Sequence, residues 1–267
     1  MPALPDASSR FELVKWYLDS VEPDGTATIA YWASLTWLGA HTTWHDLSRY
    51  ELGQKPAETS SRRAVPPPQM IEGHVAWHAE RLHLETIHEA ATPGVTLTLF
   101  EDANGRITWE CLAPSARARF DRGGTSTEGT GYVECMTMTV PPWELPIDEL
   151  RWGRWMNDTL TTSLVWIDWR GKLPRHWVLL NGSVQEGATV RDDGIDVPTG
   201  RLMLDPPRTL HDRSVGKLLR GISGLARVAT HIPLAWDEHK WCSRGTWTNA
   251  TGETLSGWSI HEMVRFT

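Results

Sequence analysis

The residues best suited to do chemistry in this sequence lie within residues 129–155. Glu134 follows Tyr132 and precedes Met136 at two-residue intervals, so all three share one face if this run is a β-strand. A carboxyl group in such an apolar row needs a partner or must take up a proton. Arg154, in the next strand-like run, is a candidate partner. We therefore predict that Glu134 is buried, either as an acid–base group or in a pair with Arg154.

The protonation state of Glu134 would decide its chemistry. A carboxyl group enclosed by apolar side chains stays protonated and can donate a proton, for example to an alkene. A nearby guanidinium, here that of Arg154, would instead keep it ionised, as a base or as half of a structural bridge. The sequence leaves these outcomes open, and a structural bridge is as well supported as a catalytic role.

Asp168 and His176 form a second candidate acid–base set. Asp168 shares a predicted strand face with Leu164 and Trp166, and His176 follows the next turn, where it could orient or deprotonate water. Both residues flank a turn, so exposure to solvent is the plainer explanation of them. The predicted catalytic residues are Glu134, Tyr132, Arg154, Asp168 and His176.

The sequence is rich in tryptophan, with 16 Trp against 4 Tyr and 4 Phe. Indole rings fill cores, but they also line apolar pockets, and their faces stabilise a nearby cation. Composition does not separate these uses. The side chains that we predict to line a ligand pocket are Trp16, Trp32, Trp152, Trp166, Trp169 and Met136.

Composition and motifs exclude several classes of function. A net charge of −7 argues against nonspecific nucleic-acid binding, which needs a basic surface. The apolar runs are shorter than a membrane span, and no secretory signal is visible. Three cysteines lack the spacing of a disulfide framework or a metal site, which indicates a reduced, cytoplasmic setting. No hydrolase elbow, phosphate loop or dinucleotide fingerprint is present, so we expect neither a metal nor another cofactor.

The order of turn signals predicts an all-β protein. More than a dozen short strand-like runs alternate with turn residues, among them Asp102-Ala103-Asn104-Gly105. Residues 38–70 are expected to be mostly loop, residues 74–89 a long strand, and residues 214–229 the one helix. A weak echo between the two halves indicates a duplicated barrel unit. We place the boundary after Pro142, giving domains 1–142 and 143–267.

Two short motifs resemble a known family. Lys15-Trp16-Tyr17-Leu18-Asp19 and Gly129-x-Gly131-Tyr132-x-Glu134 are similar to elements of the lipocalin-like proteins related to carotenoid 1,2-hydratase (hydroxyneurosporene synthase) and to AttH-type proteins. The resemblance implies two lipocalin-like antiparallel β-barrel halves over nearly the whole chain. Activities in that group include hydration of an isoprenoid double bond and pericyclic cyclisation. A His that follows the mid-chain acid in the hydratases is replaced by Cys135 here.

Two functions follow as hypotheses. The first is a cofactor-independent enzyme, a hydratase-like lyase or an isomerase, that hydrates, isomerises or cyclises a hydrophobic terpenoid or polyketide-like molecule. The second is a lipocalin-like carrier that binds a hydrophobic ligand without changing it. The sequence does not define the substrate, the reaction or the oligomeric state.

Overall fold

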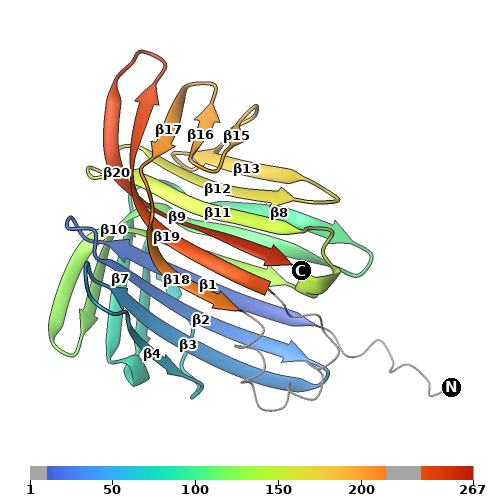
Figure 1. The fold of residues 1–267 in the computed structure, drawn as a ribbon. Helices are drawn as coiled ribbons and strands as arrows, with labels where there is room; N and C mark the ends of the chain where they lie inside the picture. Colours follow the sequence, from blue (N-terminus) through green and yellow to red (C-terminus); the bar gives the residue numbers. More distant parts are fainter. Residues whose placement is uncertain (1–10, 215–235, 267) are drawn as a thin grey trace. The chain divides into compact units, whose positions relative to one another are not determined.

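A computed structural model describes residues 11–214 and 236–266. Those residues are almost entirely antiparallel β-strand, as predicted, with two short 3-10 turns (Figure 1). The helix predicted over residues 214–229 falls outside the described residues, apart from Ser214, which ends a strand. None of the described helices is long and apolar enough to cross a membrane.

The chain divides into two compact units. Unit 1 comprises residues 1–22 and 26–145, and unit 2 comprises residues 23–25 and 146–267. Each unit has its own sheet and its own apolar cluster. The predicted division into two folding domains at 142/143 stays a prediction.

Unit 1 holds one ten-stranded antiparallel sheet. The strands follow the order β4-β3-β2-β1-β10-β9-β7-β6-β5, and β8 pairs with β9. Their bounds are β1 (Glu12–Val21), β2 (Ala27–Trp37), β3 (Ala40–Tyr50), β4 (Ala57–Ser61), β5 (Gln69–Ile71), β6 (His74–Ala79), β7 (Leu84–Ala90), β8 (Val95–Asp102), β9 (Gly105–Arg122) and β10 (Thr125–Met138). The 3-10 turns are η1 (Glu80–Leu82) and η2 (Pro142–Glu144).

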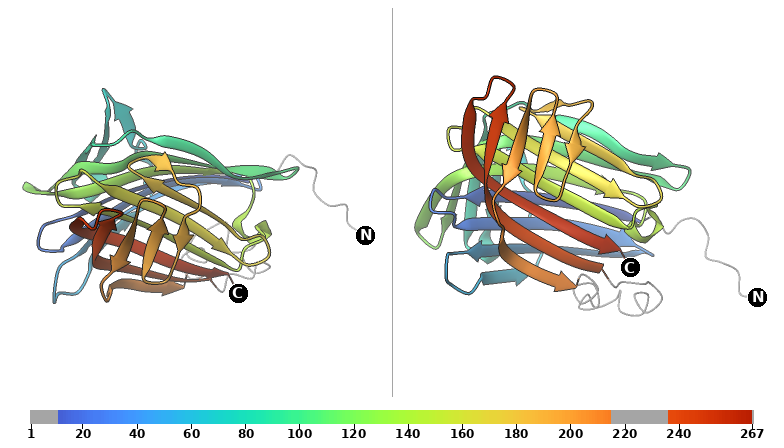
Figure 2. Two further views of the ribbon diagram at one scale, coloured as in Figure 1. Left: turned by 90° about the horizontal axis from the view of Figure 1, so that it is seen from above. Right: turned by 45° about the horizontal axis from the view of Figure 1, so that its top comes forward.

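Unit 2 repeats this topology. Its order is β14-β13-β12-β11-β20-β19-β17-β16-β15, with β18 paired to β19. The bounds are β11 (Glu149–Asn157), β12 (Ser163–Arg170), β13 (Arg175–Leu180), β14 (Ser183–Val184), β15 (Thr189–Val190), β16 (Gly194–Val197), β17 (Gly200–Leu204), β18 (Arg208–Ser214), β19 (Trp236–Asn249) and β20 (Thr254–Phe266). In both views of Figure 2 the red strands β19 and β20 lie side by side. The echo between the halves therefore reflects a repeated strand order.

Local turn chemistry sets the hairpins. Asp102 Oδ1 accepts hydrogen bonds from the backbone N–H of Asn104 at 2.8 Å and of Gly105 at 3.1 Å, which closes the predicted β8–β9 turn. In unit 2, Asn249 Oδ1 accepts from the backbone N–H of Thr251 at 3.1 Å and of Glu253 at 2.9 Å, between β19 and β20. Polar side chains thus take the place of ladder partners where the chain reverses.

Two local predictions were wrong. Residues 38–70 are not mostly loop, because β3 pairs with β2 along its whole length and carries β4 on its other edge. The run from His41 to Asp46 is polar except for Trp44, and its pairing with the neighbouring strand holds it in the strand conformation. Residues 74–89 do not form one strand either, since η1 interrupts it and His83 follows with φ of 51°.

Each sheet has an interior face and an opposite face. In unit 1 the interior face buries a cluster that includes Leu18, Trp32, Leu47 and Val133, with Trp16 packed against it. In unit 2 the equivalent cluster includes Trp155, Leu164, Trp166, Ile195, Leu202 and Trp247. Because side chains alternate along a strand, Glu134 and its neighbours two residues away occupy the opposite face of unit 1.

Candidate functional site

Glu134 is buried, as the strand pattern predicted, with 8% of its surface exposed. It lies on β10 between Tyr17 of β1 and Cys111 of β9. One carboxylate oxygen, Oε2, accepts a hydrogen bond from the Tyr132 hydroxyl at 2.7 Å and another from Trp109 Nε1 at 2.6 Å. Two neutral donors therefore converge on one oxygen of a buried acid, which fixes its orientation.

The groups beside Glu134 stay neutral at ordinary pH. Burial raises the pKa of Tyr132 well above its usual value, and the nearby carboxylate of Glu134 acts in the same direction. Burial also raises the pKa of the Cys111 thiol, to which Tyr132 is hydrogen-bonded. The Tyr132 hydroxyl therefore stays protonated and acts as a hydrogen-bond donor. The carboxyl group of Glu134 is then the group in this cluster best suited to transfer a proton.

A second tyrosine–acid pair lies directly beside the first. Tyr17 donates to Asp19 Oδ2 at 2.9 Å, and Asp19 is fully buried. The register places Tyr17 opposite Glu134 and Asp19 opposite Tyr132. The rings of Tyr17 and Tyr132 are 6.1 Å apart. Two carboxyl groups and two phenols thus alternate across one strand pair.

Trp109, Tyr17 and Asp19 were not among the predicted site residues. The spacing of Tyr17 and Asp19 repeats that of Tyr132 and Glu134, with one residue between phenol and acid. That repeat is a signal in the sequence that could have found the second pair. No such signal marks Trp109, because its contact with Glu134 depends on the β9–β10 register, which shifts between Gly131 and Glu134.

The predicted pair of Glu134 and Arg154 stays a prediction. Glu134 belongs to unit 1 and Arg154 to unit 2, so the two residues lie on different sheets. Arg154 is fully buried on β11, and its Nη1 donates to the carbonyl oxygen of Trp258 at 3.0 Å.

The predicted ligand-binding residues divide between sheet faces. In unit 1, Trp16 and Trp32 are cross-strand neighbours on the interior face, and Trp32 Nε1 donates to the carbonyl oxygen of Val65 at 3.0 Å. Met136, by contrast, shares the face of Glu134 and lies opposite Trp109. The strand pair therefore separates the two Trp side chains from the acid.

The unit 2 candidates divide in the same way. Trp166 and Asp168 lie two residues apart on β12 and share the interior face. Trp169 lies on the opposite face, together with Trp152 of β11. Asp168 is 9% exposed and accepts a hydrogen bond from Arg170 Nε at 2.7 Å. His176 is exposed on β13, opposite Asp168 in register. The structure thus brings Asp168 and His176 to neighbouring positions, with Asp168 already held by an arginine.

Sequence reasoning also missed an ion pair on unit 2. Lys240 of β19 is 1% exposed and contacts the carboxylate of Glu262 on β20, its cross-strand neighbour. Its Nζ lies 5.5 Å from the centre of the Trp152 ring. Glu238 lies 3.8 Å from Lys240 and 3.1 Å from His211. No group of three or more His, Cys, Asp or Glu side chains able to hold a metal occurs within residues 11–214 and 236–266.

Known structures identify the architecture. CghA with Sch210972 aligns over 96% of this chain and 89% of its own, with a TM-score of 0.58 and 11% identity. Kievitone hydratase from Nectria haematococca aligns over 99% and 91%, with a TM-score of 0.52 and 8% identity. The fold is lipocalin-like. A protein of Nitrosomonas europaea assigned to the AttH type aligns over 96% and 93%, with a TM-score of 0.51 and 11% identity.

These alignments confirm the predicted resemblance at the level of the fold. Identities of this size carry no residue roles from one protein to another. No protein-family pattern matches the sequence, and no curated protein matches it.

Proposed function

We propose that this protein is an enzyme that isomerises or cyclises a hydrophobic small molecule by moving a proton, with Glu134 as the acid–base group and no cofactor. One observation carries the proposal: a buried carboxylate accepts hydrogen bonds from Tyr132 and Trp109 on a single oxygen. Both donors favour the ionised carboxylate, the form that accepts a proton from an acidic carbon.

Each group has a definite part in the proposed reaction. Glu134 takes a proton from the substrate and later returns it to another carbon, so the atoms of substrate and product balance. Tyr132 and Trp109 are positioning residues that hold the carboxylate in one orientation. Hydration would begin with the protonated form of the same carboxyl group, which burial favours. The fold shared with kievitone hydratase, and with CghA, whose structure holds Sch210972, supports a small-molecule substrate. We propose one of terpenoid or polyketide type.

Hydrogen exchange at carbon tests the proton transfer with simple probe molecules in place of the substrate. A panel of hydrophobic enolisable ketones is incubated with the protein in D2O, and deuterium uptake is followed by NMR. The wild-type protein should exchange at least one member, and Glu134→Gln should slow that exchange by about 100-fold or more. Glu110→Gln is the matched control, because Glu110 lies on the neighbouring strand β9 opposite Cys135, on the other face.

Equal exchange rates for wild type and Glu134→Gln would remove Glu134 from the reaction. Tyr132→Phe adds a positioning test: loss of one donor should lower kcat by about 10-fold and change KM little. A parallel fall in Glu110→Gln would point to a general loss of structure.

The alternative is a carrier with no chemistry. It is favoured by the two tyrosine–acid pairs, because the acid of each pair already accepts a hydrogen bond from its own tyrosine. Buried polar groups that are paired in this way often have a purely structural role. A molecule that binds, gains no deuterium and is recovered unchanged after long incubation would support the carrier.

A further inference from the structure

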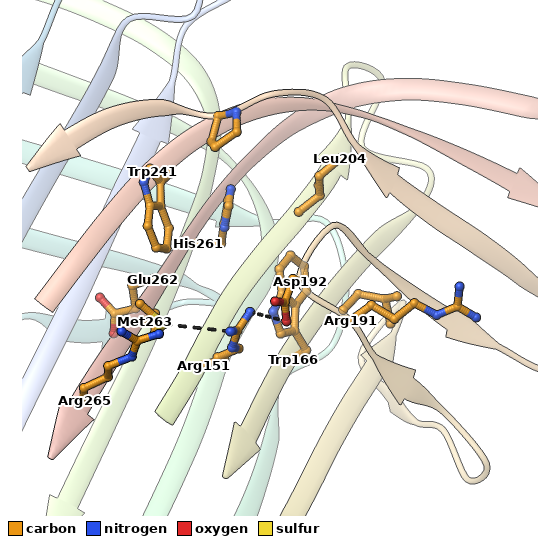
Figure 3. Close-up of a pocket in the computed structure, with 12 residues that line it drawn as sticks. Arg151, Trp166, Arg191, Asp192, Leu204, Trp241, His261, Glu262, Met263 and Arg265 are labelled. Atoms are coloured by element: carbon orange, nitrogen blue, oxygen red, sulfur yellow. Dashed lines mark hydrogen bonds and ion pairs between the residues drawn. The ribbon is translucent and has the colours of Figure 1, made fainter. Parts of the chain in front are cut away.

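Unit 2 contains a pocket on its interior face, apart from every group used in the proposed reaction. The pocket has a volume of about 270 Å³. This is slightly below the usual range of small-molecule sites, ~300–1,000 Å³, so a ligand would have to be compact. Figure 3 shows the side chains that line it, which come from β11, β12, β16, β17, β19 and β20 and from the loops before β16 and β18.

The walls suit a flat apolar molecule. Trp166 and Trp241 supply indole rings, and Leu204 and Met263 supply aliphatic surface. Gly153 makes room for the Trp166 ring, because a Cβ atom at Gly153 would lie 2.2 Å from Trp166 Cζ2. The ring can therefore lie against the strand.

Arg151 brings an underused hydrogen-bond donor to the pocket. Its Nε donates to Glu149 Oε1 and its Nη1 contacts Asp192 Oδ1, both at 2.7 Å. Its Nη2 has one acceptor among the described residues, the sulfur of Met263 at 3.8 Å (Figure 3). A thioether is a weak acceptor, so a ligand oxygen would improve on it.

His261 adds a neutral polar group. Its Nε2 is 2.9 Å from the Ser243 hydroxyl, and its ring centre is 5.4 Å from that of Trp241. Burial, with the positive charge of Arg151 adding to it, lowers the pKa of His261 to about 4. The imidazole is therefore uncharged at neutral pH, and the Ser243 contact fixes its orientation.

The charges around the pocket disfavour an ionic ligand. Two carboxylates already balance Arg151, while Arg191 is paired with Asp196 and Arg265 with Glu149 at 3.2 Å. An added anion would meet the lining carboxylates of Asp192 and Glu262, and an added cation would meet Arg151.

We propose that this pocket is a second binding site, for a compact, flat, uncharged molecule whose carbonyl-type oxygen accepts a hydrogen bond from Arg151. The apolar body of the ligand lies between Trp166 and Trp241. The site does not depend on Glu134, so it can be tested separately from the proposed reaction.

Two probes that differ in one oxygen test the site. Isothermal titration calorimetry on the full-length chain compares 4-chromanone with chromane, which lacks the carbonyl. The chromanone should bind saturably and at least about 10-fold more tightly than chromane. Arg151→Met should reduce its affinity to that of chromane. Arg201→Met is the matched control, because Arg201 is half-exposed on β17 and pairs with Asp196 outside the pocket.

A second variant protects the test against misfolding of Arg151→Met. Leu204→Trp should fill the pocket and abolish binding of both probes, whereas Glu134→Gln should bind 4-chromanone as the wild type does. Equal affinities for the two probes, no saturable binding of either, or binding that survives Leu204→Trp would each overturn the proposal. Tighter binding of chromone-2-carboxylate than of 4-chromanone would overturn the uncharged ligand class.

Discussion

Glu134 on β10 and Glu262 on β20 occupy corresponding strands of two sheets with the same order. In unit 1 the cross-strand neighbours of the acid are Tyr17 and Cys111. In unit 2 they are Trp152 and Lys240. A lysine compensates the charge of Glu262 directly, whereas phenol and indole donors hold Glu134. Corresponding strands of a repeated fold can thus carry a structural ion pair in one copy and a candidate acid–base group in the other.

The interior faces differ as well. In unit 1 Trp16 lies opposite Trp32 across β1 and β2, so two indoles fill the pair of positions. In unit 2 Gly153 lies opposite Trp166 across β11 and β12. The glycine leaves room for the Trp166 ring to lie against β11, and that ring forms one wall of the pocket described above.

Removing the lysine of unit 2 should have the largest effect. Lys240→Met leaves Glu262 without its main cation in a partly buried site, which should lower the free energy of unfolding by about 3–5 kcal/mol. Urea denaturation at neutral pH measures it. The matched control is Lys15→Met on the central strand β1 of unit 1, where the ammonium lies 5.0 Å from the Tyr31 ring and contributes ~0.5–1 kcal/mol.

The double variant sharpens that contrast. Adding Glu262→Gln to Lys240→Met removes the unbalanced carboxylate and should recover much of the lost stability. If Lys240→Met is no more destabilised than Lys15→Met, the ion pair is not what distinguishes the two sheets.

Acidification should weaken the protein through its interior histidines. The folded-state pKa of His261, about 4, lies below that of an unfolded histidine, ~6.5. The unfolded chain therefore binds more protons between these values, and stability falls as the pH drops from about 6.5 to about 4. The loss from His261 should be at most about 3 kcal/mol.

Comparing variants assigns this pH dependence to one unit. Burial also lowers the pKa of His45 in unit 1, so His261→Phe should retain the His45 contribution and lose its own. Urea unfolding at pH 4.5, 5.5 and 7 measures both. An unchanged slope in His261→Phe would contradict a buried, neutral imidazole in unit 2.

Gly153→Ala should have the smallest effect. The added methyl group meets the Trp166 ring at 2.2 Å, and overpacking of this kind costs about 1–3 kcal/mol. Thermal unfolding followed by circular dichroism measures the change. Adding Trp166→Phe, with its smaller ring, should reduce the penalty, and strict additivity of the two substitutions would show that they do not touch.

Strand alternation explains how much of this could be predicted. It placed Tyr132 and Glu134 on one face and indicated a buried acid, because both residues lie on one strand and their relation is local. Trp152 and Trp155 are three residues apart on β11, so side-chain alternation places them on opposite faces of the sheet. The sequence therefore already implied that the tryptophans could not all line one cavity.

Other features depend on register between strands, which the sequence does not reveal. Trp109 reaches Glu134 across β9 and β10, and Lys240 reaches Glu262 across β19 and β20. A one-residue change in either register would turn these side chains to opposite faces. Strand β3 was missed for a related reason, since its polar sequence forms a strand through pairing with β2.

The pairing of β1 with β10 also orders events during synthesis. Leu13 lies opposite Met138, and Leu150 lies opposite Val264. The β1–β10 pairing and the β11–β20 pairing can therefore form only after the last strand of each half has left the ribosome. Closing such long loops is slow. Until β10 has been synthesised, the edge of β1 that pairs with it has no partner strand and stays exposed. All ten strands of the first half are made before the second half begins, so this edge can be covered early.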